Sequence, residues 1–129
     1  MQLVKVIGAF DKGWIIAEVE FNQANKDRKI MIIDQHAAHG RVRLEFLLSH
    51  PSEQEGPIFK LDALDKKLLL SKNSADLEAF KSRACQGAVK ITDKLDKDFH
   101  VPLLNALFQC RFPFICAHGR PTMASLYNQ

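Results

Sequence analysis

Two short clusters in this chain hold residue types that commonly bind divalent cations. The first contains Asp34, His36 and His39, within residues 34–39 (DQHAAH). A carboxylate and imidazoles are frequent metal ligands, and two histidines three residues apart share one face of a helix. Structural interpretations stay open beside this one. Asp34 could cap a helix through its side-chain oxygen, and a histidine pair at this spacing is often incidental.

The second cluster is Cys116 and His118, which precede a Gly-Arg-Pro turn at residues 119–121. In an extended segment, side chains two residues apart point the same way, so a thiolate and an imidazole could address one ion. Arg120 could bind a phosphate or carboxylate through two hydrogen bonds, or brace the turn. Taken alone, Cys-x-His also fits a buried, inert cysteine beside a histidine with satisfied hydrogen bonds.

Length, composition and charge indicate a single globular domain. The 129 residues are 47% hydrophobic and 26% charged, which suffices for a buried core. A net charge of +3 is compatible with nucleic acid but is no evidence for it. No apolar run approaches the roughly 18 residues that cross a bilayer, and no signal-peptide pattern begins the chain. We therefore expect no membrane association.

The three cysteines are widely spaced and odd in number, so they do not suggest a disulfide framework. A reducing compartment is the expected setting, where cysteine near histidine suggests metal binding or reactivity. Cys85 and Cys110, taken by themselves, have the surroundings of small core residues.

The elements that position the clusters can be predicted from hydrophobic patterning. Strands are expected at residues 3–10 and 14–21, joined by a turn at 11–13 in which Gly13 supplies a positive φ. Residues 29–34 (KIMIID) form a nearly continuous apolar run, typical of a strand buried on both faces. A helix should follow from about His36, so Asp34 and His36 fall at a strand-to-helix junction, where ligands often bind.

The second half of the chain is predicted to be mainly helical. The first helix ends before Pro51, and residues 58–70 fit either a strand or a helix. The remaining predictions are a helix over residues 75–91 capped by Asn73 or Ser74, a helix within 93–110 that begins at Asp96 or Asp98 with Pro102 in its first turn, and a short extended segment at 112–116. The expected fold class is α+β, with helices packed on a mostly antiparallel sheet.

Three stretches, in this order, resemble one known family: residues 34–45 (DQHAAHGRVRLE), 84–91 (ACQGAVKI) and 116–123 (CAHGRPTM). They are similar to the carboxy-terminal dimerisation and endonuclease domain of MutL-type DNA mismatch-repair proteins. The branch they most resemble is the third eukaryotic MutL homologue, which is associated with meiotic crossing-over. The post-replicative mismatch-repair endonuclease subunit is the alternative branch. The resemblance covers the chain from about Val4 to Met123.

The resemblance implies a metal-dependent nuclease that hydrolyses one DNA strand. It implies zinc at a thiolate-rich position, and manganese or magnesium for nicking. Arg120 would contact a phosphate or brace its turn. The implied catalytic residues are Asp34, His36 and Glu45, and the implied metal ligands are Asp34, His36, Cys85, Cys116 and His118.

Gly40 departs from the family pattern. In the family, two intervening residues separate the motif Asp-Gln-His-Ala from a Glu, and the position of that Glu is Gly40 here. A Glu four residues after His36 would lie one turn along the same helix face and share its cation. Two interpretations therefore remain: a nicking endonuclease domain, or a catalytically impaired dimerisation module in which His39 could act as a substitute ligand. An unrelated small metal-binding domain is a third.

Length is a second departure from the family, whose members carry a regulatory subdomain between the first helix and the Ala-Cys helix. Here about residues 50–73 form a remnant of that insertion. Residues 66–71 (KKLLLS) lack the Gln and Pro of a sliding-clamp motif, so clamp binding is doubtful. The family's ATP-binding region is missing, so we expect no ATP site in this chain. The expected partners are DNA and, through strands in residues 3–21, the first eukaryotic MutL homologue as a heterodimer in the nucleus.

Overall fold

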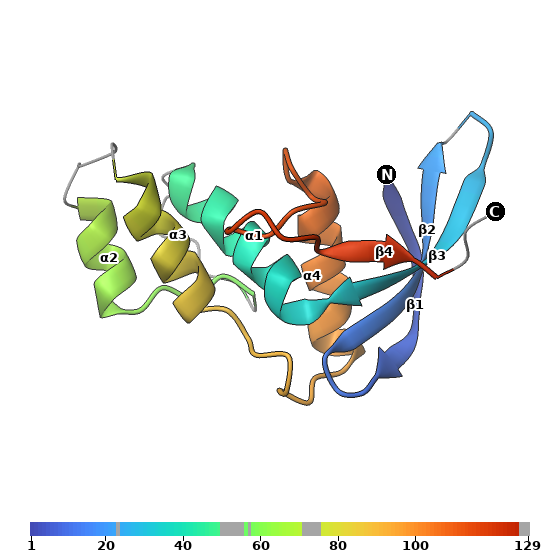
Figure 1. Ribbon diagram of the computed structural model, residues 1–129, viewed down its shortest axis with the longest axis horizontal. Coiled ribbons are helices and arrows are strands. Elements are labelled where there is room, and N and C mark those ends of the chain that lie inside the picture. Colours follow the sequence, from blue (N-terminus) through green and yellow to red (C-terminus); the bar gives the residue numbers. More distant parts are fainter. Residues whose placement is uncertain (23, 50–55, 57, 71–75, 127–129) are drawn as a thin grey trace.

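The computed structural model describes residues 1–22, 24–49, 56, 58–70 and 76–126, and these residues form an α+β fold (Figure 1). The predicted fold class is therefore confirmed. In chain order, the elements of this part are β1 (Gln2–Phe10), β2 (Trp14–Asn22), β3 (Asp27–Asp34), α1 (Gln35–Leu48), α2 (Ala63–Leu70), α3 (Leu77–Gln86), α4 (Lys97–Gln109) and β4 (Met123–Ser125).

The four strands form one antiparallel sheet in the order β1-β2-β3-β4. One face of the sheet packs on helices. Its buried side chains, such as Ile15, Val19 and Ile33, form a core with Leu103 and Leu107 of α4. The prediction that β3 is buried on both faces is wrong, because its buried and half-buried side chains alternate as they do in a sheet with one covered face.

Helix α1 lies between the sheet and the pair formed by α2 and α3 (Figure 1). Residues 37–44 are all buried, so two turns of α1 are covered around their whole circumference. Ala38 and Val42 join the core of the sheet, whereas Leu44 and Leu47 pack with Phe80 of α3. Helix α1 is thus the element that connects the two halves of the fold.

Several helix boundaries differ from the predicted ones. Helix α3 begins after Asp76, whose side chain accepts from the backbone N–H of Ala79, and ends at the C-cap Gly87. It is therefore shorter than predicted, and the predicted caps Asn73 and Ser74 lie outside the described residues. Helix α4 begins after Asp96, one of the two predicted starts. Pro102 is not in the first turn but at the sixth residue of α4, where it cannot donate the usual helical bond.

The turn between β1 and β2 has a different basis from the predicted one. Asp11 and Lys12, not Gly13, have positive φ values, of 47° and 69°. Glycine is needed at position 13 because a Cβ atom there would lie 2.0 Å from the carbonyl oxygen of Ile91. Gly13 therefore allows close contact between this turn and the chain that connects α3 with α4.

Two further predictions concern residues 58–70, which were left open, and residues 112–116, which were expected to form a strand. The ambiguous stretch at residues 58–70 forms α2 over Ala63–Leu70. The late strand is β4, which pairs with β3, and not the segment at 112–116, where Ile115 makes only a single bridge to Pro121. Among the described residues, no helix is long and apolar enough to span a membrane.

Candidate functional site

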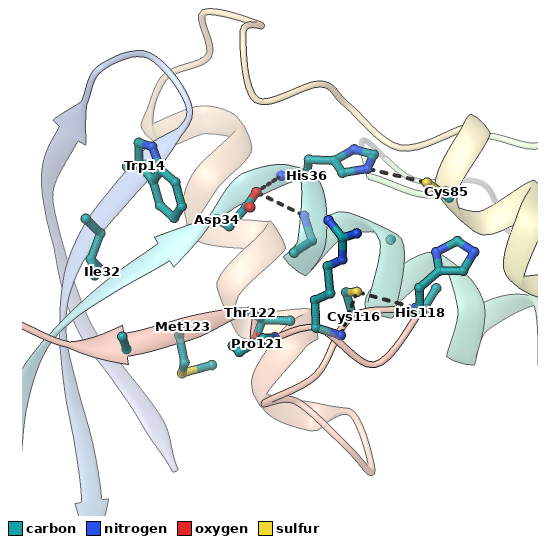
Figure 2. A pocket seen from close by; sticks show the side chains of 15 residues that line it. Trp14, Ile32, Asp34, His36, Cys85, Cys116, His118, Pro121, Thr122 and Met123 are labelled. Atoms are coloured by element: carbon teal, nitrogen blue, oxygen red, sulfur yellow. Dashed lines mark hydrogen bonds between the residues drawn. The ribbon is translucent and has the colours of Figure 1, made fainter.

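A pocket of about 650 Å³ lies where the end of β3, the start of α1, the end of α3 and residues 116–124 meet (Figure 2). The predicted site residues that it brings together are up to 86 positions apart in the chain, from Asp34 to Arg120. All the predicted site residues except Glu45 line it, namely Asp34, His36, Cys85, Cys116, His118 and Arg120, and so does Gly40.

His36 has an orientation that suits a metal ligand. Its Nδ1 lies 2.9 Å from the carbonyl oxygen of Val89, and a carbonyl can only accept, so Nδ1 carries the hydrogen. The other ring nitrogen, Nε2, lies 3.4 Å from Sγ of Cys85 (Figure 2). A backbone carbonyl that holds one imidazole nitrogen leaves the lone pair of the other available, as is usual for metal-binding histidines.

Cys116 and His118 reach the pocket from a tight turn, not from the extended segment that was predicted. The backbone N–H of Cys116 donates to the carbonyl of Arg120 over 2.6 Å, and Gly119 adopts a φ of 84° that favours glycine. Sγ of Cys116 accepts from the backbone N–H groups of His118 (3.3 Å) and Arg120 (3.2 Å). The turn therefore holds the sulfur atom in a defined position at the wall of the pocket.

Asp34 combines the structural role with a place in the pocket. As the N-cap of α1, its Oδ1 accepts from the backbone N–H groups of His36 (2.9 Å) and Ala37 (3.1 Å). The backbone N–H of Asp34 also donates to the carbonyl of Thr122, which joins the two pocket walls. Only Oδ1 takes part in the cap, and Asp34 lines the pocket. Its role as a metal ligand stays a prediction.

His39 does not fit the predicted role of a substitute ligand. Its Nδ1 accepts from the backbone N–H of Val89 (2.9 Å), and its Nε2 donates to the carbonyl of Ile58 (2.8 Å). Burial lowers the pKa of His39 to about 4, so the ring is neutral at pH 7. Because both ring nitrogens are used and the side chain is buried away from the pocket, His36 and His39 do not share one ligand site.

Glu45 lies outside the pocket lining and binds the backbone next to it. Its carboxylate accepts from the N–H groups of Arg111 (2.6 Å) and Phe112 (3.1 Å), and pairs with Arg41 at 3.4 Å. Arg41 in turn donates to the carbonyls of Ile115 (2.7 Å) and Cys116 (2.9 Å). These contacts anchor the segment that carries Cys116. The catalytic role implied for Glu45 by resemblance remains untested.

Arg43 fixes the end of α3, which carries Cys85. It donates to the carbonyls of Arg83 and Ala84, both at 3.1 Å, and pairs with Asp65 at 3.1 Å. The Arg43 and Asp65 side chains are only 3% and 1% exposed. Breaking this ion pair would leave a charge buried without its partner, which is costly. The pair and the hydrogen bonds of Arg43 therefore hold the end of α3 in place.

Arg41 and Arg43 were missed from the sequence, as was Gln35, whose amide donates to the carbonyls of Lys90 and Asp93. Charged and polar residues along a helix usually indicate a solvated face. The signal that could have identified these residues is their placement between Asp34 and Glu45, in a helix whose two ends both carry candidate site residues.

The types of side chain in the pocket suit a soft divalent cation, but the distances between them are too long for a ready-made site. Imidazole and thiolate groups suit zinc. However, no three His, Cys, Asp or Glu side chains in the described part of the chain lie close enough together to form a ready metal site. His36 and Cys85 form a direct pair, and Cys116 and His118 line the same pocket from the opposite segment.

Comparisons with known proteins point to one family, although no family model matches the chain. The chain is 26% identical to the DNA mismatch repair protein MutL of Clostridium tetani, over 95% of this chain and 28% of that protein. It is 49% identical over 45 residues to the human DNA mismatch repair protein Mlh3, which is 35% of this chain and 3% of that protein. Saccharomyces cerevisiae MLH3 is 41% identical over 49 residues, 38% of this chain and 7% of that protein.

The chain thus spans less than a third of the length of the relatives it matches. The match with the clostridial protein extends over 183 positions, which is longer than the 129-residue chain, so that protein holds intervening residues that this chain lacks. The similarity covers nearly the whole chain, and the motifs that suggested it meet at one pocket. The chain is similar to MutL and Mlh3 DNA mismatch-repair proteins.

Proposed function

We propose that this chain is the carboxy-terminal dimerisation and endonuclease domain of a MutL-family protein, with a shortened regulatory insertion at about residues 50–73. The proposed activity is metal-dependent nicking of DNA in mismatch repair and meiotic recombination, in the nucleus. The observation that carries this proposal is the single pocket that collects His36, Cys85, Cys116 and His118 from three separate segments. The short matches to Mlh3 proteins support the meiotic branch weakly.

The pocket offers groups for each part of such a reaction. His36, Cys85, Cys116 and His118 would hold a zinc-type cation, and Asp34 would help to hold the ion used for nicking. A bound divalent cation supplies positive charge that stabilises a phosphodiester under attack. Arg120 lines the same pocket and carries a guanidinium of the kind that binds phosphate through two hydrogen bonds. It would orient the DNA backbone over these ligands.

The proposed partner is the first eukaryotic MutL homologue, bound through the strands in residues 3–21. Large apolar side chains on β1 support an interface there, because Ile7 and Phe10 are 47% and 60% exposed. Exposed apolar side chains gathered on one strand are a common mark of a protein interface. Residues 66–70 of the segment considered for sliding-clamp binding lie in α2, and Ser71 lies outside the described residues.

A second candidate function is a dimerisation module of the same family with impaired nicking. Gly40 lines the pocket one helical turn after His36, and a Cβ atom built there meets nothing within 4 Å. A Glu at this position would therefore fit and would reach the pocket, whereas glycine contributes no oxygen. We expect the loss of this carboxylate to weaken the catalytic ion more than the ion held by the thiolates.

A supercoiled-plasmid nicking assay with manganese tests both candidates. The chain joined to its partner is compared with Gly40→Glu and, as a matched control, Gly40→Ala. Gly40→Glu is expected to raise the nicking rate about tenfold or more, since ligand-shell changes have effects of that size. Gly40→Ala should leave the rate unchanged, because it adds no oxygen. Equal nicking by all three proteins would show that Gly40 does not limit activity.

A further inference from the structure

His39 makes a buried contact between α1 and the chain that connects α3 with α4. Its Nδ1 accepts from the backbone N–H of Val89, and its Nε2 donates to the carbonyl of Ile58. The two partners select one tautomer, because the N–H can only donate and the carbonyl can only accept. The ring is 5% exposed and meets the Phe99 ring edge-on at 5.3 Å between centroids, so its orientation is fixed.

Val89 links His39 to His36. Its N–H is held by His39, and its carbonyl oxygen accepts from Nδ1 of His36 over 2.9 Å. The second contact places the lone pair of His36 on Nε2, which lies 3.4 Å from Sγ of Cys85 (Figure 2). The tautomer and direction of His36 therefore depend on the position of Val89.

His39 is the side chain that binds Val89 itself. Gln35 holds the same connection one residue later, through the carbonyl of Lys90 at 2.7 Å, and again at Asp93. Gln35 thus fixes the path of the chain, whereas the acceptor of the Val89 N–H is Nδ1 of His39. Burial lowers the pKa of His39 to about 4, which keeps this nitrogen an acceptor at neutral pH.

We propose that His39 is a positioning residue for the pocket. By accepting the N–H of Val89, it holds the Val89 carbonyl in the place that sets the tautomer and direction of His36. The inference rests on the proposed function, in which Nε2 of His36 binds a divalent cation. In that function, the Val89 carbonyl orients the ligand His36, and the buried His39 in turn positions Val89.

Two substitutions of similar chemistry separate the two hydrogen bonds of His39. An Asn side chain places its oxygen near the position of Nδ1, so His39→Asn keeps the acceptor for Val89 and loses the donor to Ile58. A Gln side chain places its amide nitrogen near the position of Nε2, so His39→Gln keeps the donor to Ile58 and loses the acceptor. Both substitutions remove the ring, and each serves as the control for the other.

The first readout is the tautomer of His36, measured from its ¹⁵N chemical shifts by NMR in the metal-free 129-residue chain. The wild type and His39→Asn should show hydrogen on Nδ1, and His39→Gln should show a mixture. The second readout is cobalt(II) binding, followed by the absorption of the thiolate–cobalt pair. The affinities of the wild type and His39→Asn should agree within about twofold, and that of His39→Gln should be about tenfold lower.

Unfolding in urea, measured for the same proteins, separates positioning from stability. The proposal is overturned if both variants keep the wild-type tautomer, or if both lower cobalt affinity equally. If His39→Gln does not fold, His39→Asn still decides, because a changed His36 tautomer in that variant contradicts the proposal. If the wild type binds no cobalt, the proposed metal site fails, while the NMR comparison still tests the role of His39.

Discussion

His36 and His39 lie three residues apart in α1, yet their surroundings give the two rings different chemistry. His36 lines the pocket with Nε2 directed at Cys85, whereas His39 is buried with both nitrogens bonded to backbone groups. The sequence left open whether both face one ligand site, because helical spacing says nothing about which backbone groups each ring meets. The decisive partner of both, Val89, is 50 or more residues away in the chain.

The burial of neutral His39 predicts a loss of stability in acid. Its pKa is about 4 in the folded chain against 6.5 in a model compound, so between these values only the unfolded chain takes up the proton. The stability present above pH 6.5 should therefore decrease as the pH falls toward 4. From pH 7 to pH 5, the cost is about 2 kcal/mol of unfolding free energy.

Urea unfolding of the metal-free wild type and of His39→Asn at pH 7 and pH 5 measures this contribution. The variant lacks the titrating ring, so its stability should fall by about 2 kcal/mol less than that of the wild type over the same interval. His100, whose pKa is also lowered by burial, is present in both proteins and cancels from the comparison. The same loss in both proteins would mean that His39 does not titrate as its burial requires.

At the scale of elements, α1 positions both walls of the pocket. Arg41 and Glu45 hold the backbone of the segment that leads to Cys116, and Arg43 holds the end of α3 next to Cys85. The sequence predicted this helix and its strand-to-helix junction from apolar runs and motif residues. It could not predict these contacts, because their partners lie 40 to 75 residues away and a polar residue on a helix is usually solvated.

Substitution by alanine at two different glycines should change the stability of the fold in opposite directions, and this tests the packing. At Gly87, a Cβ atom would lie 2.1 Å from Nη2 of Arg43, which is held in place by its buried contacts. Gly87→Ala should therefore lower stability by roughly 1–3 kcal/mol. At Gly40, inside α1, a Cβ atom meets nothing within 4 Å, so Gly40→Ala should raise stability by about 1 kcal/mol.

Thermal or urea unfolding of the two glycine variants beside the wild type gives both signs in one experiment. Shifts of the midpoint in opposite directions are expected. If Gly87→Ala leaves the midpoint unchanged, Arg43 moves aside without cost. The ion pair between Arg43 and Asp65 then does not fix the end of α3.

At the scale of the whole molecule, the fold brings residues from three separate stretches of sequence to one pocket. The α+β class, the first three strands and the helix after them could be predicted, because apolar runs and helical spacing are local properties. The approach of the turn at Gly13 to Ile91 and the end of α3 at Gly87 could not, because each depends on contacts between distant segments. The same holds for the meeting of Cys85 with His36, which only resemblance to a family anticipated.

Cys110 provides a matched control for the cysteines of the pocket. Burial raises its pKa to about 12, so its thiol stays protonated at neutral pH, and its Sγ lies 3.5 Å from the carbonyl of Ala106 in α4. Cys85 and Cys116, by contrast, line the pocket. Replacing each cysteine with serine in turn therefore removes a thiol inside the proposed metal centre or one outside it.

The measurement that tests the central claim most directly is the zinc content of the purified chain and of its three cysteine-to-serine variants. We predict one zinc per wild-type chain, the same content in Cys110→Ser, and loss of most of the zinc in Cys85→Ser and Cys116→Ser. A wild-type chain that binds no zinc, or three variants that retain it equally, would contradict the assignment of this pocket as a metal centre.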